Sequence, residues 1–301
     1  MTKRLLILHI TLIIFARTVF CQYYYHDNRY MASNIVLEAG VTMGAMNSLT
    51  DIGGKPGIGK GFIKDLRMEF SRPCIGIYLG ATYKDVISLR VEATLGSTRA
   101  SDDVLKNDRE ASFGRYERNL SFRSPIREVQ LCAEVHPLFF RNYETDEAPY
   151  WSPYLVAGIG LFSFNPQARL RNKWLDLHPL RTEGQGFPEY RNRKPYSLLQ
   201  LNVPAGLGLR YEAGPFVTVR AELIHRFLFT DYLDDVSEDS YVDPALFHLH
   251  LPAPQAEIAA QLSNRSGRPF QETQRGNPSR NDSYFTFVIK IGMQLRRLRR
   301  D

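Results

Sequence analysis

The sequence predicts an all-β fold: an eight-stranded antiparallel up-and-down transmembrane β-barrel with long extracellular loops. Three observations lead to this prediction: strand-like alternation in eight segments, a regular sequence of long and short connections, and an export signal at the start of the chain. The stretch DVISLRVEATLG, residues 85–96, places apolar residues at every second position, with Arg90 and Glu92 between them. A period of two indicates a β-strand with two unlike faces. In a soluble sandwich the apolar face would meet a core, whereas in a membrane barrel it meets lipid and the charges line the lumen.

The first residues predict export. Two basic residues precede a short apolar run that ends at Phe20, which is typical of a secretory signal peptide and too short for a membrane-spanning helix. We therefore predict a signal peptide at residues 1–21 and one outer-membrane barrel domain at residues 22–301. A lipoprotein acylated at Cys21 is the alternative, and the bulky Phe20 argues against it.

Net charge, cysteine content and the lengths of the apolar stretches further limit the class of protein to which the chain can belong. The formal net charge of +6 falls by three when residues 1–21 are removed, which is too little to predict nucleic-acid binding. Cys74 and Cys132 remain in the mature chain and do not make a disulfide framework. Because no later stretch approaches ~18 consecutive apolar residues, any membrane span must be made of strands.

Eight segments share the alternation, and most reach the ~9–11 residues that a tilted strand needs to cross a bilayer. The predicted strands are residues 34–45, 74–83, 85–96, 127–136, 154–164, 198–212, 216–229 and 284–296.

The connections between these segments alternate in length. Lys84-Asp85 and Ala213-Gly214 form tight turns, and a connector of about 15 residues links the fourth and fifth segments, whereas the other connections have roughly 25, 30, 33 and 53 residues. Outer-membrane barrels have long outer loops and short periplasmic turns in this order. A soluble sandwich or a lipocalin-like barrel, the alternative, gives no reason for such alternation.

The polar faces of the predicted strands carry charges of both signs. An eight-stranded barrel has an interior just wide enough for side chains to fill, and an unpaired buried ion costs several kcal/mol. We therefore expect an Arg/Glu network that plugs the lumen and leaves no pore. Its predicted members are Glu38, Arg90, Glu92, Glu128, Glu134, Arg210, Glu212, Arg220, Glu222 and Lys290.

Two loop motifs suggest metal chemistry only weakly. The acidic stretch at residues 227–243 could offer carboxylates to Ca²⁺, but it lacks the EF-hand spacing, so a solvated start of an outer loop is expected. His248 and His250 could be zinc ligands, but no third ligand is adjacent, and loop surface is the expected role.

Catalysis is not predicted. His136 and His225 lie on strands, and neither has an obvious serine and acidic companion for hydrolysis. The predictions therefore include no catalytic, cofactor-binding or metal-binding residue, no cofactor and no enzyme activity.

Four longer stretches carry a family resemblance, and together they span nearly the whole mature chain. They are LEAGVTMGAMNSLTDIG, LSFRSPIREVQLCAEVHPLFF, SPYLVAGIGLFSFNPQARLRNKWLDLHPLRTEGQG and FLFTDYLDDVSEDSYVD. These stretches resemble the PorG family, outer-membrane β-barrels of the type IX secretion system in Bacteroidetes. The resemblance implies a structural role: to tie a periplasmic ring of PorK/PorN-type proteins to the outer membrane, without catalysis.

The resemblance also suggests partners and site residues. It implies membrane lipids and PorK/PorN-type ring proteins as partners, with neither nucleic acid nor a small-molecule substrate. We expect docking through residues 22–30, residues 140–150 and a basic tail, and we expect the matching loop residues to pack as a lid that braces the barrel mouth. The tail comprises Arg296, Arg297, Arg299 and Arg300, and the loop motif comprises Trp174, Gly184, Gly186, Asp231, Tyr232, Asp234 and Asp235.

Three other functions remain open at this stage. A generic outer-membrane barrel could bind an external ligand or surface through its extracellular loops. A barrel enzyme would need a titratable cluster in the upper lumen or on the loops, and a channel would need an open lumen.

Overall fold

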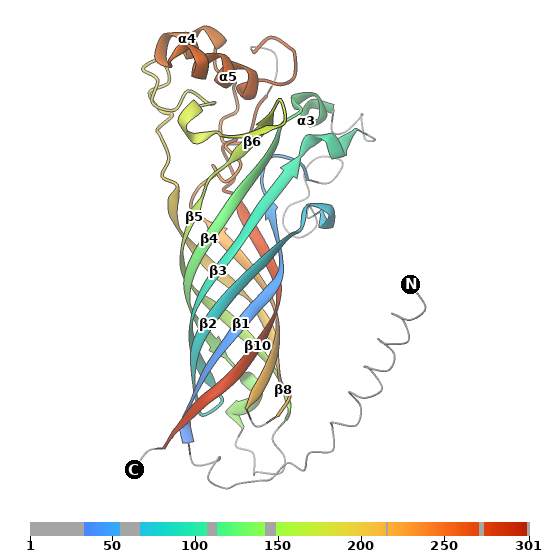
Figure 1. Cartoon of the computed structure of the whole chain (residues 1–301), viewed down its shortest axis with the longest axis vertical. Helices are drawn as coiled ribbons and strands as arrows, with labels where there is room; N and C mark the ends of the chain where they lie inside the picture. Colours follow the sequence, from blue (N-terminus) through green and yellow to red (C-terminus); the bar gives the residue numbers. More distant parts are fainter. Residues whose placement is uncertain are drawn as a thin grey trace.

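The computed structural model describes residues 33–54, 67–106, 113–141, 149–214, 216–270 and 274–299. Within these ranges eight long strands form the wall of a barrel (Figure 1). They are β1 (Ser33–Leu49), β2 (Arg72–Tyr83), β3 (Ile87–Ser101), β4 (Ser121–Val135), β5 (Trp151–Phe164), β8 (Leu199–Glu212), β9 (Val217–Leu228) and β10 (Ser283–Arg299).

The wall is closed by hydrogen bonds on all sides. Each long strand pairs antiparallel with the next one along the chain, and β10 returns to pair with β1. A closed cylinder has no free sheet edge, so the backbone groups of the strands are paired within the wall. The predicted eight-stranded antiparallel up-and-down barrel is confirmed.

Shorter elements extend the wall at one end. β6 (Gln167–Leu170) pairs with β7 (Lys173–Asp176), and this hairpin joins β4 through the pair Arg123 and Gln167. None of the helices in the described ranges is long and apolar enough to cross a membrane. The helical elements are η3 (Met68–Phe70), η4 (Asp102–Leu105), α3 (Phe113–Arg118), η5 (Pro137–Phe140), η6 (His178–Leu180), α4 (Pro244–His250) and α5 (Ala253–Ser263).

The long connections gather at one end of the barrel, where α3, α4 and α5 lie (Figure 1). At the other end Lys84 and Asp85 turn β2 into β3 with φ of +50° and +59°. Two positive φ values define the two-residue turn whose twist suits a hairpin. The alternation of long loops and tight turns is therefore confirmed. The last long loop is not irregular throughout, because it folds into α4 and α5.

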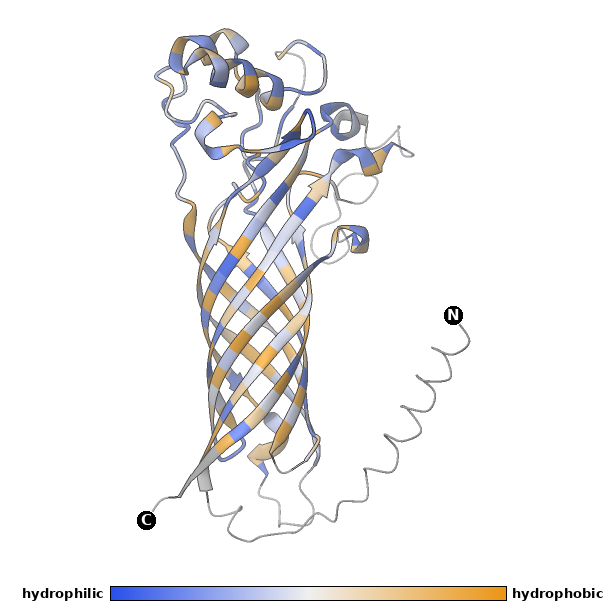
Figure 2. Ribbon diagram, in the orientation of Figure 1, coloured by the Kyte–Doolittle hydropathy of each residue, from blue (hydrophilic) through white to orange (hydrophobic). Residues whose placement is uncertain are grey.

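The outer surface of the barrel is apolar. Ile77, Leu79, Ile159 and Leu207 point outward and are 61–65% exposed, and hydrophobic bands alternate with polar ones along each strand (Figure 2). The opposite face of the same strands carries buried charges. Apolar side chains outside a closed barrel with a polar interior form the arrangement of a bacterial outer-membrane barrel. The long loops are then extracellular, and the turn at Lys84 is periplasmic.

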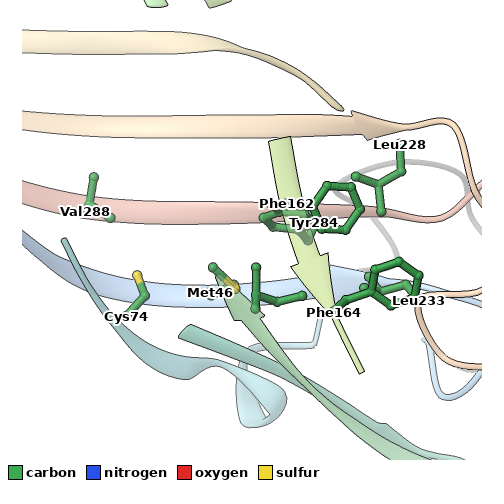
Figure 3. Packing of buried hydrophobic residues seen from close by; sticks show 9 residues of the cluster. Met46, Cys74, Phe162, Phe164, Leu228, Leu233, Tyr284 and Val288 are labelled. Carbon is green, nitrogen blue, oxygen red and sulfur yellow. The ribbon is translucent and has the colours of Figure 1, made fainter. Parts of the chain in front are cut away.

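Three hydrophobic clusters lie above the charged part of the lumen, and one of them packs Val236 of the last long loop against Phe70 and Phe122. A second contains Phe162, Phe164 and Tyr284 of the strands, packed with Leu233 of the last long loop (Figure 3). The third holds the loops together, with Phe247 of α4 packed among residues from η6, β6 and α5. The extracellular loops therefore form a folded lid, which we define as residues 165–198 and 229–282.

Candidate functional site

The lumen contains a network of buried ion pairs, and Arg90 is its most connected member. Its Nη1 and Nη2 donate to the two carboxylate oxygens of Glu222 at 2.6 and 3.1 Å, and Nη1 also donates to Glu134. Its Nε lies 3.2 Å from Glu92 Oε2. Lys290 Nζ lies 2.9 Å from Glu222 Oε2 and also contacts Glu92. The network thus joins β3, β4, β9 and β10.

A second cation extends the network around the wall. Arg220 Nη1 donates to Glu134 at 2.6 Å, and its Nη2 reaches Glu38 at 3.1 Å. The Tyr78 hydroxyl donates to Glu38 at 2.5 Å. Every charged group named here so far is at most 4% exposed. At this level the lumen is therefore filled by paired side chains and closed to solvent.

A separate ion pair lies nearer the lid. Arg226 on β9 binds Glu128 on β4, with its Nε 3.1 Å from Oε2. Asn202 also donates to Glu128 at 2.7 Å, and Thr286 accepts a hydrogen bond from Arg226. Arg226 was not among the predicted lumen charges, although it shares the inward parity of Arg220 and Glu222. The alternation along β9 could have identified it.

The periplasmic mouth holds the remaining predicted lumen charges. Arg210 contacts Glu212 and lies 3.2 Å from Asp85 in the β2–β3 turn. Glu212 and Asp85 are 23% and 34% exposed, so this group borders water. It lies at the end of the barrel opposite the lid.

His136 has companions that the sequence did not reveal. Its Nδ1 lies 2.8 Å from Ser152 Oγ, and its Nε2 lies 3.6 Å from Glu134 Oε2, which is longer than a hydrogen bond. The sequence showed no obvious companion for His136, and the structure places a serine and a carboxylate beside it. All three side chains are at most 2% exposed. The arrangement holds three buried polar groups together. His225, in contrast, packs between Phe227 and Phe285, with ring centroids 4.1 and 4.2 Å away.

Within the lid, residues 182–196 contact residues 232–235 directly. Thr182 donates a hydrogen bond to Asp235, and the Tyr196 hydroxyl donates to the other oxygen of Asp235 at 2.7 Å. Tyr232 stacks on Tyr196 with ring centroids 4.4 Å apart. Gly184 and Gly186 have φ of +71° and +79°, which allows the tight turns of this segment.

Glu183 anchors the lid from within. Its carboxylate accepts hydrogen bonds from the backbone N–H groups of Ser237 and Glu238, both at 3.0 Å, and from Arg275 Nη1. Burial raises the pKa of Glu183 to about 7, and the Arg275 guanidinium opposes that rise. One buried carboxyl thus ties three parts of the lid together.

Four aspartates meet where the lid covers the barrel mouth: Asp51, Asp231, Asp234 and Asp282. Burial, followed by the neighbouring aspartates, raises the pKa of Asp231 to about 9 and that of Asp282. The pKa of Asp234 rises to about 8 through burial and Asp51. Asp231 is 8% exposed and Asp234 is fully buried. The expectation of a solvated acidic loop is therefore wrong for Asp231, Asp234 and Asp235, whereas Asp239 of the same stretch is exposed.

Backbone contacts explain why two of these acids, Asp234 and Asp282, are buried. Asp234 accepts hydrogen bonds from Ile52 N–H and Val236 N–H, both at 3.0 Å, and Asp282 accepts one from Leu233 N–H at 2.8 Å. They satisfy loop donors that would otherwise be buried without partners. In the described part of the chain, no three histidine, cysteine, aspartate or glutamate side chains are arranged to hold a metal ion.

The other predicted residues lie elsewhere. Trp174 lies on β7 outside the lid core, where its ring is 4.2 Å from the Arg123 guanidinium carbon. His248 and His250 belong to α4, and His250 Nε2 lies 2.8 Å from Glu189 Oε2.

The predicted docking segments are only partly described. The backbone of β10 reaches Arg299 and pairs with β1 there. The side chains of Arg296, Arg297 and Arg299 lie outside the described part, as do Arg300, residues 22–30 and most of residues 140–150. The predicted signal peptide, residues 1–21, lies outside it as well.

Comparisons with known proteins add fold relatives of low similarity. No protein-family model and no curated protein sequence matches this chain. Among solved structures, Neisserial surface protein A has a TM-score of 0.37 at 10% identity, covering 87% of this chain and 98% of its own. Ail of Yersinia pestis, in complex with the heparin analogue sucrose octasulfate, has a TM-score of 0.35 at 10% identity, covering 86% and 99%. The outer membrane protein OprG from Pseudomonas aeruginosa has 0.34 at 10%, covering 88% and 96%.

Proposed function

We propose that this protein is a non-enzymatic structural component of the type IX secretion system, in which the barrel anchors a periplasmic ring to the outer membrane. The observation that carries the structural role is the filled lumen. Arg90, Glu222 and Lys290 are at most 2% exposed, and Glu222 pairs with both cations inside the wall. A barrel filled in this way serves as a rigid membrane anchor, whereas a conduit needs a continuous water path.

The link to type IX secretion is supported by the sequence. The stretches around residues 152–186 and 227–243 resemble the PorG family, and both contribute to one folded lid through the bond between Thr182 and Asp235. A lid that braces the mouth suits a barrel that must keep its shape while it carries load. The ring proteins of such a system are periplasmic, so docking would use the end opposite the lid.

Conductance tests the anchor directly. We expect purified protein in planar bilayers to give negligible ion current, because paired charges occupy the lumen. A steady large conductance would overturn the anchor and favour a channel.

Partner capture tests the secretion role. We expect the tagged full chain, purified from solubilised membranes of its own organism, to recover PorK/PorN-type ring proteins. A variant with Arg296, Arg297, Arg299 and Arg300 all changed to Gln should recover less, and the matched change to Lys should not. Absence of ring proteins from the wild-type sample would contradict the proposal, whereas equal recovery with the Gln variant would remove only the tail as the dock.

The lid supports a second candidate function, binding of an external ligand or surface. It has its own hydrophobic core, and Leu249 on α4 is 69% exposed. A chain whose residues 244–263 are replaced by a short Gly/Ser linker discriminates the two functions. Normal secretion with lost surface binding would favour this candidate over the anchor.

A further inference from the structure

Three arginines converge on the outside of the barrel near its extracellular end. Arg99 on β3 and Arg123 on β4 are direct partners in the antiparallel register and share the outward face. Arg169 on β6 lies close by, because Gln167 of the same strand pairs with Arg123. The positive charges of Arg72, Arg123 and Arg169 all repel that of Arg99. Like charges placed opposite each other on two strands repel. A bound anion would relieve the repulsion among these arginines.

The protein itself supplies no such anion in the described part of the chain. None of Arg72, Arg99, Arg123 and Arg169 forms an ion pair there; Arg123 Nε donates to Gln167 Oε1 at 2.7 Å, and Arg169 Nη2 donates to Asn172 Oδ1 at 2.8 Å. The adjacent carboxylate on β7, that of Asp176, accepts from Asn165 and Gln167 instead. The lumen arginines differ, since each of them has a glutamate partner.

The barrel wall carries a band of exposed apolar side chains, which we call the apolar belt. The height of the arginines above this belt identifies their surroundings. On β3 the outward side chains change from Leu95, which is 54% exposed, through Ser97 to Arg99. At about 3.3 Å per residue and a tilt near 45°, Arg99 stands roughly 9 Å above Leu95. Lipid headgroups occupy the outer ~5–7 Å on each side of the hydrocarbon core. The backbone at Arg99 therefore lies just above this layer, and its long side chain reaches back to the headgroups of the outer leaflet.

Trp174 completes the site. Its ring lies 4.2 Å from the Arg123 guanidinium carbon and 6.0 Å from that of Arg99. It is also the register partner of Arg169 across the β6–β7 hairpin. A tryptophan prefers the interface between lipid and water, and its ring holds guanidinium groups by cation–π attraction. The indole thus keeps two guanidinium planes in place while their N–H donors stay available.

We propose that Arg99, Arg123 and Arg169, with Trp174 beneath them, form a binding site for the phosphate group of a lipid in the outer leaflet. Guanidinium groups bind phosphate oxygens through paired N–H donors, and several of them suit a doubly charged phosphate monoester. The site faces sideways from the wall above the belt, which is the direction from which a lipid headgroup approaches. A phosphorylated glycolipid is therefore the ligand class.

Native mass spectrometry of the detergent-solubilised full chain tests the site, with bisphosphorylated lipid A as the probe and dephosphorylated lipid A as the matched ligand control. We expect the wild type to bind the phosphorylated form at least about tenfold more tightly. Arg99→Gln/Arg123→Gln should lose that preference. The control Arg191→Gln/Lys194→Gln, which removes two positive charges from exposed lid positions, should retain it.

Further measurements distinguish a lipid phosphate from free inorganic phosphate and check that the variants are folded. Arg99→Lys/Arg123→Lys should bind more tightly than the Gln pair, because it keeps the charge without the guanidinium fork. Heat-modifiable migration in gels checks that each barrel is folded. Three results would overturn the proposal. The Gln double variant could bind the phosphorylated lipid as tightly as the wild type does, or the Lys double variant could bind it no more tightly than the Gln double variant. Millimolar inorganic phosphate could also displace the lipid.

Discussion

Arg90 and Glu222 lie 132 positions apart in the sequence and meet inside the barrel through two parallel hydrogen bonds of 2.6 and 3.1 Å. The pair spans from β3 to β9 across the lumen, since these strands are not neighbours in the wall. Lys290 and the Tyr154 hydroxyl also bind Glu222. Glu222 therefore pairs with two buried cations, and Glu92 and Glu134 supply their remaining counter-charge. Such shared pairing explains how the lumen can hold so many charges out of contact with water.

Glu222→Gln is expected to destabilise the barrel by about 3–5 kcal/mol, because it removes the carboxylate charge that pairs directly with both Arg90 and Lys290 in a site closed to water. Urea unfolding of the protein in lipid vesicles measures the change. Glu257→Gln on the exposed face of α5 is the control and should change the unfolding free energy by less than about 0.5 kcal/mol. Equal stabilities for the two variants would show that the lumen pairs contribute nothing measurable.

Gly158 and Gly80 offer a matched test of wall packing. A Cβ at Gly158 would overlap the carbonyl oxygen of Leu131 on β4, which is backbone and cannot move aside. A Cβ at Gly80 would lie 3.5 Å from the Leu89 carbonyl oxygen, an ordinary contact. We expect Gly158→Ala to cost about 1–3 kcal/mol and Gly80→Ala to cost much less. Unfolding in urea again gives both values, and the reverse order would contradict the strand register between β4 and β5.

The stability of the lid should depend on pH through Asp231 and Asp234. These carboxyls titrate near 3.8 when unfolded but have a pKa of about 9 and about 8 in the folded lid, chiefly because of burial. At any pH between the unfolded and the folded pKa values, the folded lid binds more protons than the unfolded one. The free energy of unfolding of the lid therefore falls as the pH rises from about 4 to about 9. Hydrogen-exchange protection factors of residues 231–237 measure this fall.

Asp231→Asn removes one of the titrating groups. The variant should be better protected than the wild type at pH 9, with a smaller change between pH 5 and pH 9. Asp239→Asn alters an exposed acid of the same loop and should follow the wild type. Protection that stays constant or increases with pH in the wild type would refute the buried acidic cluster.

The barrel was predictable from the sequence because its determinants are local. Arg90 and Glu92 alternate with apolar residues. This one short pattern predicts that the segment is a strand, which of its faces points into the lumen, and that the other face meets lipid. Ser152 and His136 were within reach of the same reasoning, since each continues the inward parity of its strand. Their contact also needed the pairing of β4 with β5, which no local pattern contains.

The lid was not predictable in the same way, because distant residues determine it. Asp234 was expected in water, yet the backbone of Ile52, 182 positions away, binds its carboxylate. Glu183 meets Arg275 across 92 positions. Neither contact leaves a periodic pattern. The arginine site has the same origin, since Arg169 reaches Arg99 and Arg123 only through the β6–β7 hairpin.

The central claim is that the strands face hydrocarbon with their apolar side chains, and a nitroxide at Val91 tests it most directly. Val91 points outward between Arg90 and Glu92 and is 51% exposed. In lipid vesicles, with Cys74 and Cys132 replaced by Ala, we expect a label on Val91→Cys to be relaxed by dissolved oxygen and not by a water-soluble nickel complex. Stronger relaxation by the nickel complex would place that face in water and contradict the account.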